Sequence, residues 1–199
     1  MTVEANERVL LPLVRPWNGD VPTRARQLET ETCPVLYART LIERWHSRLP
    51  KTQKGPWMAA YHCHFDGLTY AVALWHNPST RSLPSSWLEL RRMAVAPDAP
   101  HCTASSFLQA MARHLAIARP ECERFISYQD TEVHTGTIYR AAGWEPAHTG
   151  GVRERDRTGL RVGTQRAYRT NLNGRAPDKA AKVRWEWVPT AHRPGAVTS

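Results

Sequence analysis

Two polar residues that follow an apolar run could take part in proton transfer. Asp130 comes directly after the run Arg124–Gln129, and His134 follows four residues later. A carboxylate can orient an imidazole as a general base, or it can orient an amine nucleophile directly. The structural alternatives are that Asp130 caps a following helix and that His134 is simply exposed. His46, beside the apolar face of an earlier segment, is a third acid–base candidate, and its alternative is a satisfied core histidine.

His62 and His64 are spaced as metal ligands could be. Alternation along a strand puts both imidazoles on one face and Cys63 on the other. Together with His46 they could suggest a metal site, but two histidines on the solvent side of a hairpin are the commoner arrangement. We therefore predict no metal. The cysteines form no CxxC pair, which favours reduced thiols and an intracellular protein, with Cys102 structural; they are Cys33, Cys63, Cys102 and Cys122.

The positive charge is concentrated near the carboxyl end. The net charge is +9, and residues 1–150 hold 16 Lys and Arg against 14 Asp and Glu, whereas residues 151–199 hold 11 against 4. Such a basic segment with interleaved aromatics favours DNA or RNA as a partner, and a solubilising tail or a solvated hairpin face is the alternative. The cations predicted to contact nucleic acid here are Arg153, Arg155, Arg166, Lys182 and Arg184.

These residues need a scaffold, and residues 87–144 follow the order strand, turn, helix, strand, helix. Strands that each lead into a helix form βα units of a parallel or mixed sheet, and ligands bind at the carboxyl ends of such strands. We therefore expect the site at that edge of an α/β sheet. The predicted elements are strands over Trp87–Val95 and Arg124–Gln129, and helices over Thr103–Arg119 and His134–Ala142, the second closed by Gly143.

The segments before this unit also show clear patterns. A helix is expected to begin near Thr32 and to end before Pro50, and Trp57–Phe65 and Leu68–Trp75 read as strands. The connecting Asp66-Gly67 is a strong hairpin signal, because a type I′ turn needs positive φ at both positions. Later strands are predicted over Trp144–Ala147, Thr164–Arg169 and Val183–Val188.

Arg91 and Arg92 are adjacent on a predicted strand. Alternation sends their side chains to opposite faces, so only one of them can face the cleft and the other is solvated. We assign Arg91 to the cleft, as a contact for a phosphate or a carboxylate. Thr103 or Ser105 is expected to cap the following helix through its hydroxyl oxygen.

The order of these elements resembles the GNAT family of N-acetyltransferases over roughly residues 35–170. The stretch 88–98 (LELRRMAVAPD) is similar to the central strand of that family, and residues 135–144 (TGTIYRAAGW) to its helix ending in Tyr-x-x-x-Gly-aromatic. The resemblance implies a mixed central sheet flanked by helices and acetyl-CoA or a related acyl donor. It also implies that Tyr139 is a general acid, and that the donor's pantetheine arm pairs with backbone groups of Met93, Ala94 and Val95.

Residues 101–106 (HCTASS) stand where the family has a glycine-rich phosphate loop, and both glycines are absent here. A helix N-terminus with hydroxyl side chains can still bind an anion. The resemblance therefore assigns the donor phosphates to Thr103, Ala104, Ser105 and Ser106.

A narrower resemblance is to the phage Mom DNA-modification proteins, a divergent GNAT-like group. It is carried by Ser127-Tyr128-Gln129-Asp130, by residues 134–144 (HTGTIYRAAGW), by Lys182-Val183-Arg184-Trp185 and by a His46-bearing first helix. The resemblance implies transfer of a small acyl-derived group onto a DNA base, adenine in the Mom case. It adds His46 to the expected site beside Asp130, His134 and Tyr139.

Together these patterns predict one domain, with an N-terminal extension (1–32), a transferase domain (33–188) whose segment 151–188 is basic, and a disordered tail (189–199). No run of about 18 apolar residues or secretory signal is present, so we expect no membrane and a cytoplasmic location, that of the host if the protein is phage-encoded. The alternatives are an acetyl-CoA-dependent N-acetyltransferase of a small amine or a protein, and a non-catalytic DNA-binding protein with the same fold.

Overall fold

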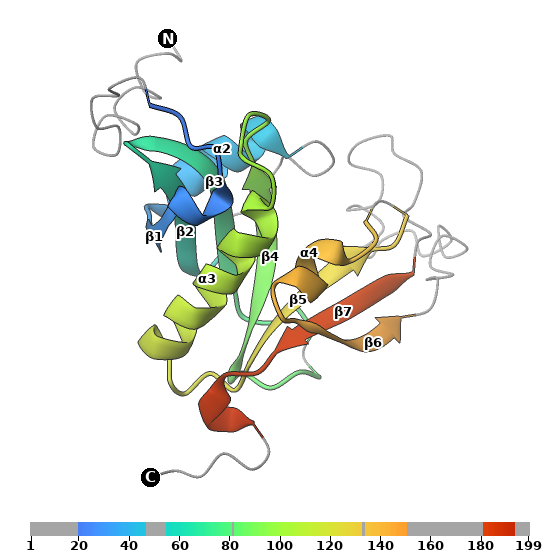
Figure 1. Ribbon diagram of the computed structural model, residues 1–199. Coiled ribbons are helices and arrows are strands. Elements are labelled where there is room, and N and C mark those ends of the chain that lie inside the picture. The colour runs from blue at the N-terminus through green and yellow to red at the C-terminus, as the bar shows by residue number, and fades with distance from the viewer. Residues whose placement is uncertain (1–19, 47–54, 81, 133, 151–180, 194–199) are drawn as a thin grey trace, which may run out of the picture.

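Seven strands of the described chain form one mixed sheet in the order β1-β2-β3-β4-β5-β7-β6 (Figure 1). The computed structural model describes residues 20–46, 55–80, 82–132, 134–150 and 181–193. Among the paired strands only β4 and β5 are parallel, so the predicted mixed α/β sheet is confirmed. The strands are β1 (Glu29–Thr32), β2 (Trp57–Phe65), β3 (Leu68–His76), β4 (Trp87–Val95), β5 (Arg124–Asp130), β6 (Glu145–Gly150) and β7 (Lys182–Trp187).

The helices cover both faces of this sheet. They are α2 (Val35–Trp45), α3 (Thr103–Ala118) and α4 (Thr137–Ala141), with short 3-10 turns η1 (Ala25–Gln27) and η3 (Thr190–His192). Alternation along β3 divides the core: Val72 and Leu74 pack with α2, whereas Ala73 and Trp75 pack on the side of α3. Figure 1 shows α3 and α4 on the near face and α2 behind the sheet.

The predicted hairpin of β2 and β3 is confirmed with its turn. Asp66 has φ +47° and Gly67 has φ +81°, as a type I′ connection requires. The apolar face predicted for the first helix is also buried, namely Tyr37, Ala38, Leu41 and Ile42. The helix begins at Val35, with Pro34 at the N-cap position.

The last helix is shorter than predicted. Only Thr137–Ala141 is helical, so His134 lies in the preceding turn and not on the helix. Gly136 ends that turn with φ +77°, and a Cβ atom there would lie 2.5 Å from Cζ2 of Trp185 and 2.7 Å from Oε1 of Gln129. The close approach of these two side chains therefore sets where α4 can begin. Gly143 has φ +75°, as expected for a residue that closes a helix.

Two of the predicted segment boundaries can be compared with the described residues. Strand β1 pairs with β2, so the sheet begins at Glu29, inside the predicted N-terminal extension. The predicted strand over Thr164–Arg169 and most of the basic segment lie outside the described residues. No helix among the described residues is long and apolar enough to cross a membrane.

Candidate active site

Strands β4 and β5 pair only along their first halves. The parallel ladder joins Trp87–Leu90 to Arg124–Ser127 and then stops, although both strands continue. Just beyond it, β3 pairs Trp75 with Leu90 and Leu74 with Arg92, so Arg91 forms a bulge. Figure 1 shows the two strands diverging toward their carboxyl ends.

Among the described residues, the divergence leaves one backbone edge of β4 without a strand partner. Met93, Ala94 and Val95, the predicted contacts for the donor arm, lie on this unpaired stretch. Backbone N–H and C=O groups need partners, and an extended ligand with amide groups can supply them as an added strand would. The pantetheine arm of an acyl-CoA is such a ligand, so this edge fits the predicted donor.

The hydroxyls at the start of α3 are used differently from the prediction. Thr103 Oγ1 donates to the carbonyl of Pro100 at 2.7 Å, and Ser105 Oγ donates to that of Cys102 at 3.1 Å. Neither caps the helix, so the predicted capping role was wrong; the N-cap residue is Cys102, with φ +69°. Phosphates at this position would be bound by first-turn N–H groups, together with the exposed Ser106.

Three cationic or titratable residues gather beside the divergence. His46 is the C-cap of α2, Arg92 lies on β4, and His134 follows β5. Burial is the main cause that lowers the pKa of His46, and the charges of Arg92 and His134 lower it further. The structure thus brings together His46 and His134, two of the predicted acid–base residues, although they are 88 positions apart in the sequence.

Arg92, and not Arg91, is the arginine near His46. Its Nη1 donates to the carbonyl of Arg91 at 2.7 Å, and its buried Nε makes no hydrogen bond with the described residues. Arg92 is therefore not the solvated arginine of the pair. Arg91 forms an ion pair with the buried Glu89 at 2.8 Å, and its predicted phosphate contact stays a prediction. Sequence alternation separates the two side chains but cannot say which face holds the site.

Tyr139 is buried on the inner face of α4. Its hydroxyl lies 2.9 Å from Oγ of Ser127 on β5, and its ring stacks on Trp185 with centroids 5.2 Å apart. Burial raises the pKa of Tyr139, and the hydrogen bond with Ser127 partly opposes that shift. The hydroxyl is therefore protonated at neutral pH, as a proton donor must be.

Asp130 ends β5 and organises the turn that follows. Its Oδ1 accepts a hydrogen bond from N–H of Glu132 at 3.1 Å, and its carbonyl accepts one from N–H of His134 at 3.0 Å. Asp130 therefore does not cap α4, whose first residue is Thr137. The contact ties Asp130 to His134 through the backbone, which leaves the predicted orientation of the imidazole untested.

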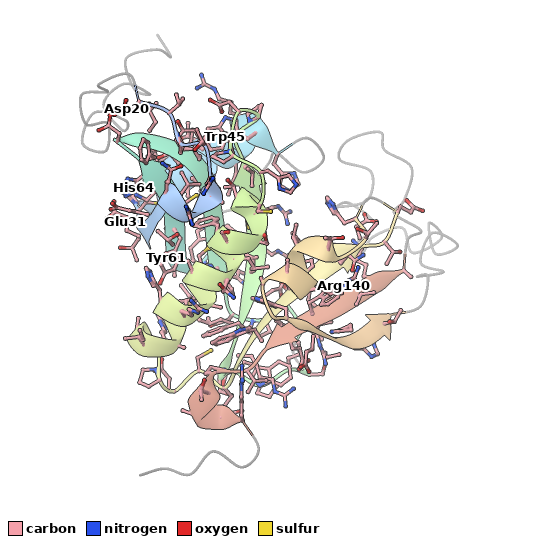
Figure 2. The ribbon with its side chains drawn as sticks, in the orientation of Figure 1. Asp20, Glu31, Trp45, Tyr61, His64 and Arg140 are labelled. Carbon is pink, nitrogen blue, oxygen red and sulfur yellow. The ribbon has the colours of Figure 1, made fainter. Side chains whose placement is uncertain are left out.

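A buried polar chain supports the same turn from β7. Trp185 Nε1 donates to Oε1 of Gln129 at 2.7 Å, and Gln129 Nε2 donates to the carbonyl of His134. Arg140 lies over the Trp185 ring at 5.5 Å and donates to the carbonyl of Thr135 (Figure 2 labels Arg140). Trp185 therefore connects Tyr139 to the loop that carries His134.

The described part of the predicted nucleic-acid segment lies on β7. Arg184 pairs with the buried Glu186 at 2.8 Å and lies over the Trp87 ring at 5.6 Å, where Arg124 also stacks at 5.0 Å. Lys182 is opposite Asp130 in the ladder. The other predicted contacts, Arg153, Arg155 and Arg166, lie outside the described residues.

The pKa of His46 predicts a pH dependence of stability. Because that pKa is lowered in the folded chain, the unfolded chain takes up the proton first as the pH falls below about 6.5. The free energy of unfolding that this neutral imidazole contributes is fully present above pH 6.5 and should be lost as the pH falls through the folded pKa. The loss should be less than about 1.4 kcal/mol per pH unit, because the ring is only half-buried. Denaturant titrations between pH 7.5 and about 4.5 should show a shallower decline for His46→Asn. Identical slopes for both proteins would contradict this.

The comparisons with known proteins agree with this architecture. The sequence matches the Mom protein family over residues 27–172. The ribosomal-protein-S18-alanine N-acetyltransferase from Escherichia coli is 11% identical, with a TM-score of 0.53, covering 86% of this chain and 99% of that one. The ribosomal-protein-S5-alanine acetyltransferase from Vibrio fischeri is 6% identical, with a TM-score of 0.54, covering 88% and 100%.

A third solved structure, AAC(6')-Ib in complex with paromomycin and acetyl-CoA, is 10% identical with a TM-score of 0.52, covering 87% of this chain and 99% of that one. No curated protein sequence matches the chain. At these identities the structural likeness shows the fold, and the family match covers well over half of the sequence. The chain therefore belongs to the Mom protein family and has the GNAT fold.

Proposed function

We propose that this protein is a DNA-modifying transferase that moves a small acyl-derived group from an acyl-CoA, or a related acyl thioester, to the amine of a DNA base. The observation that carries the proposal is the unpaired edge of β4 beside His46 and Arg92, in a chain of the Mom family. The edge suits the amide-bearing arm of the donor, and the neighbouring side chains suit an amine acceptor. The base is adenine or a base that already carries a modification.

In the proposed reaction the amine nitrogen attacks the carbonyl carbon of the thioester. The new bond is N–C, the broken bond is C–S, and the sulfur leaves as a thiolate. His46 or His134 accepts the amine proton; the lowered pKa of His46 keeps its imidazole neutral and able to do so at pH 7. Tyr139 protonates the thiolate, and Asp130 orients His134 or the amine.

Arg92 adds a contact that the sequence did not assign. Its buried Nε–H has no acceptor among the described residues, and a buried donor of this kind favours an acceptor from a ligand. The developing negative charge on the thioester carbonyl oxygen would provide one, which lowers the barrier to attack. The donor phosphates would bind at Thr103–Ser106, mainly through backbone N–H groups.

DNA would be held by the cationic residues of β7 and of the segment before it. Arg184 and Arg124 each stack on Trp87, and Arg124 remains 43% exposed while it pairs with Glu186. Such guanidinium groups can contact phosphates without losing their internal partners. The other cations that we propose contact DNA are Lys182 and, earlier in the sequence, Arg153, Arg155 and Arg166, and Arg91 is a further candidate contact.

The second candidate function is acetyl-CoA-dependent N-acetylation of a small amine or a protein, which is favoured by the names of the structural neighbours. A third is DNA binding without catalysis. These differ from the main proposal in what they change: the second alters a small molecule or a protein, and the third alters nothing.

Mass spectrometry of nucleosides from plasmid DNA tests the proposal directly. DNA from cells that express the protein should contain a heavier nucleoside, and the mass increment should identify the transferred group. The base should be unmodified when Arg92→Met is expressed to the same level, whereas Arg124→Gln should reduce modification less, since it removes one of several DNA contacts. Unmodified DNA from folded protein would contradict the proposal.

Two binding measurements would then separate the other candidate functions. Acetyl-CoA binding without a DNA effect would support the second candidate. Salt-dependent DNA binding without acetyl-CoA binding would support the third.

A further inference from the structure

The largest departure from the sequence prediction concerns His62 and His64. Both were expected on the solvent side of the hairpin, but their side chains are only 2% and 12% exposed. Strand β1 pairs beside them, with Glu31 opposite His62 in the ladder, and brings a carboxylate across both rings. The edge strand therefore completes a cluster that the hairpin alone does not suggest.

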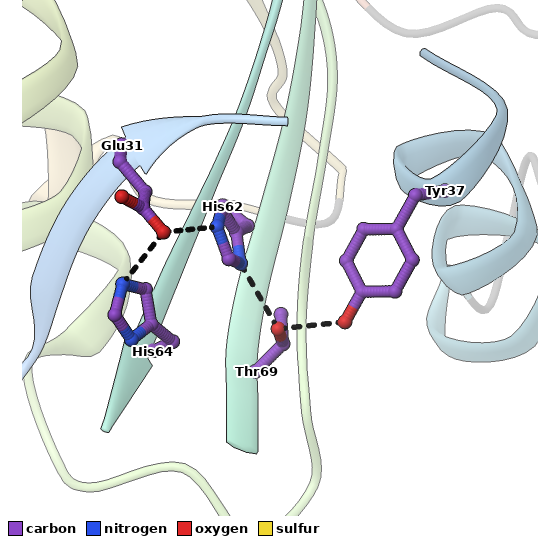
Figure 3. A network of polar contacts seen from close by, with 5 residues as sticks. All are labelled: Glu31, Tyr37, His62, His64 and Thr69. Atoms are coloured by element: carbon purple, nitrogen blue, oxygen red, sulfur yellow. Dashed lines mark hydrogen bonds and ion pairs between the residues drawn. The ribbon is translucent and has the colours of Figure 1, made fainter. Parts of the chain in front are cut away.

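The contacts within this cluster converge on one point. Oε1 of Glu31 lies 3.1 Å from Nε2 of His62 and 3.0 Å from Nε2 of His64, and Figure 3 shows both rings turned toward this oxygen. The three atoms all lie within 4.8 Å of one another. Two ligand atoms on one tetrahedral zinc ion are roughly 3.3 Å apart, given bonds of about 2.0–2.1 Å. The two distances from Oε1 of Glu31 to the imidazole nitrogens are close to that spacing.

Hydrogen bonding does not account for both imidazoles. Nε2 of His62 is within hydrogen-bond geometry of Glu31, but the buried Nε2 of His64 makes no hydrogen bond with the described residues, although it lies 3.0 Å from the same oxygen. Ion pairing of both rings would require two protonated imidazoles, stacked with centroids 4.8 Å apart. Two like charges at that separation repel each other, so a shared cation between neutral rings explains the arrangement better.

The surroundings of His62 resemble the support that metal-binding histidines have. Oγ1 of Thr69 lies 3.0 Å from Nδ1 of His62 and 2.7 Å from the hydroxyl of Tyr37 (Figure 3). When Nδ1–H donates to Thr69, Thr69 can donate to Tyr37, and the lone pair on Nε2 of His62 is directed to the point that Glu31 and His64 share. The edge of Tyr37 also packs against the His62 ring at 5.9 Å, which fixes its orientation.

We propose that Glu31, His62 and His64 form a binding site for one divalent transition-metal ion, with zinc as the best match. Two imidazoles and a carboxylate suit Zn²⁺ and its first-row neighbours, whereas Mg²⁺ and Ca²⁺ prefer oxygen ligands throughout. Glu31 is 59% exposed, so the ion can enter from solvent and keep a water ligand.

This site is separate from the candidate active site. His62 contacts Tyr37 in the first turn of α2, whereas His46 follows the last residue of the same helix. Figure 2 shows Glu31 and His64 together at the edge of the molecule away from Arg140. The ion would join edge strand β1 to β2, and its effect is on the folded structure, so the test does not depend on DNA modification.

Metal binding to the full chain tests the proposal after treatment with a chelator and its removal by dialysis. Calorimetry with ZnCl₂ should give one tight site per chain, and zinc should raise the unfolding temperature. Glu31→Gln and His64→Gln should each weaken binding by at least about 10-fold, since each removes one of three ligands. Far-UV circular dichroism checks that both variants fold; Glu31→Gln is nearly isosteric and lies on an exposed side chain.

Two further measurements identify the ligands. His101→Gln is the matched control, because His101 and Cys102 form an exposed pair, with Nδ1 and Sγ 3.0 Å apart, that could capture zinc independently. This variant should keep the tight site. Cobalt in place of zinc should give visible absorption without a thiolate charge-transfer band. The proposal is overturned by no binding, by unchanged binding in both Glu31→Gln and His64→Gln, or by a thiolate band that His101→Gln weakens.

Discussion

Tyr139→Phe should abolish most of the DNA modification and leave the fold intact. The substitution removes only the hydroxyl, which we propose protonates the departing thiolate. A positioned general acid contributes about 10²–10⁴-fold to a rate, so the modified nucleoside should fall by at least about 100-fold. The phenylalanine ring can keep its stacking on Trp185, whose centroid lies 5.2 Å away.

Ser127→Ala is the matched control for this experiment. It removes the same hydrogen bond, Ser127 Oγ to Tyr139 OH at 2.9 Å, but keeps the phenol. Both variants should lose about 1 kcal/mol of stability, and only Tyr139→Phe should lose the proton donor. Nucleoside mass spectrometry at matched expression compares them. Equal losses of modification in the two variants would show that the hydroxyl acts only through the hydrogen bond, and full activity in Tyr139→Phe would remove the acid role altogether.

Gly136→Ala should have the largest effect on stability. The residue has φ +77°, and a methyl group would meet Cζ2 of Trp185 at 2.5 Å and Oε1 of Gln129 at 2.7 Å. Neither side chain can retreat easily, because Trp185 is 2% exposed and the two are hydrogen-bonded to each other. A left-handed residue costs about 1–2 kcal/mol and overpacking about 1–3 more, so we expect a loss of about 2–5 kcal/mol.

Gly143→Ala separates the two contributions. Gly143 has φ +75°, but nothing lies within 4 Å of the position that a Cβ atom would take. This variant should therefore lose only the backbone part, about 1–2 kcal/mol. Denaturant unfolding followed by circular dichroism measures both variants. Equal losses of unfolding free energy in Gly136→Ala and Gly143→Ala would contradict the prediction, because they would show that Trp185 moves aside for the added methyl group.

Several features of this protein follow from the sequence alone, because they depend on residues close together in the chain. The Asp66-Gly67 turn requires positive φ at adjacent positions, and it joins two runs with strand-like composition, so the β2–β3 hairpin is predictable. The order of β4, α3 and β5 follows from local periodicity in the same way. The order of the motifs around His46, Asp130, Tyr139 and Lys182 predicted the family, and the match over residues 27–172 confirms it.

Other features depend on contacts between distant segments, which local patterns do not encode. Trp185 on β7 packs against Gly136 and, with Gln129, determines where α4 begins, so the helix predicted from His134 was too long. The pairing of β4 with β3 produces the bulge at Arg91, and Arg92 is the arginine that lies beside His46. Glu31 reaches His62 and His64 only because β1 adds to the edge of the sheet. In each case strand pairing across the chain, and not the residue pattern, decided which side chains share a site.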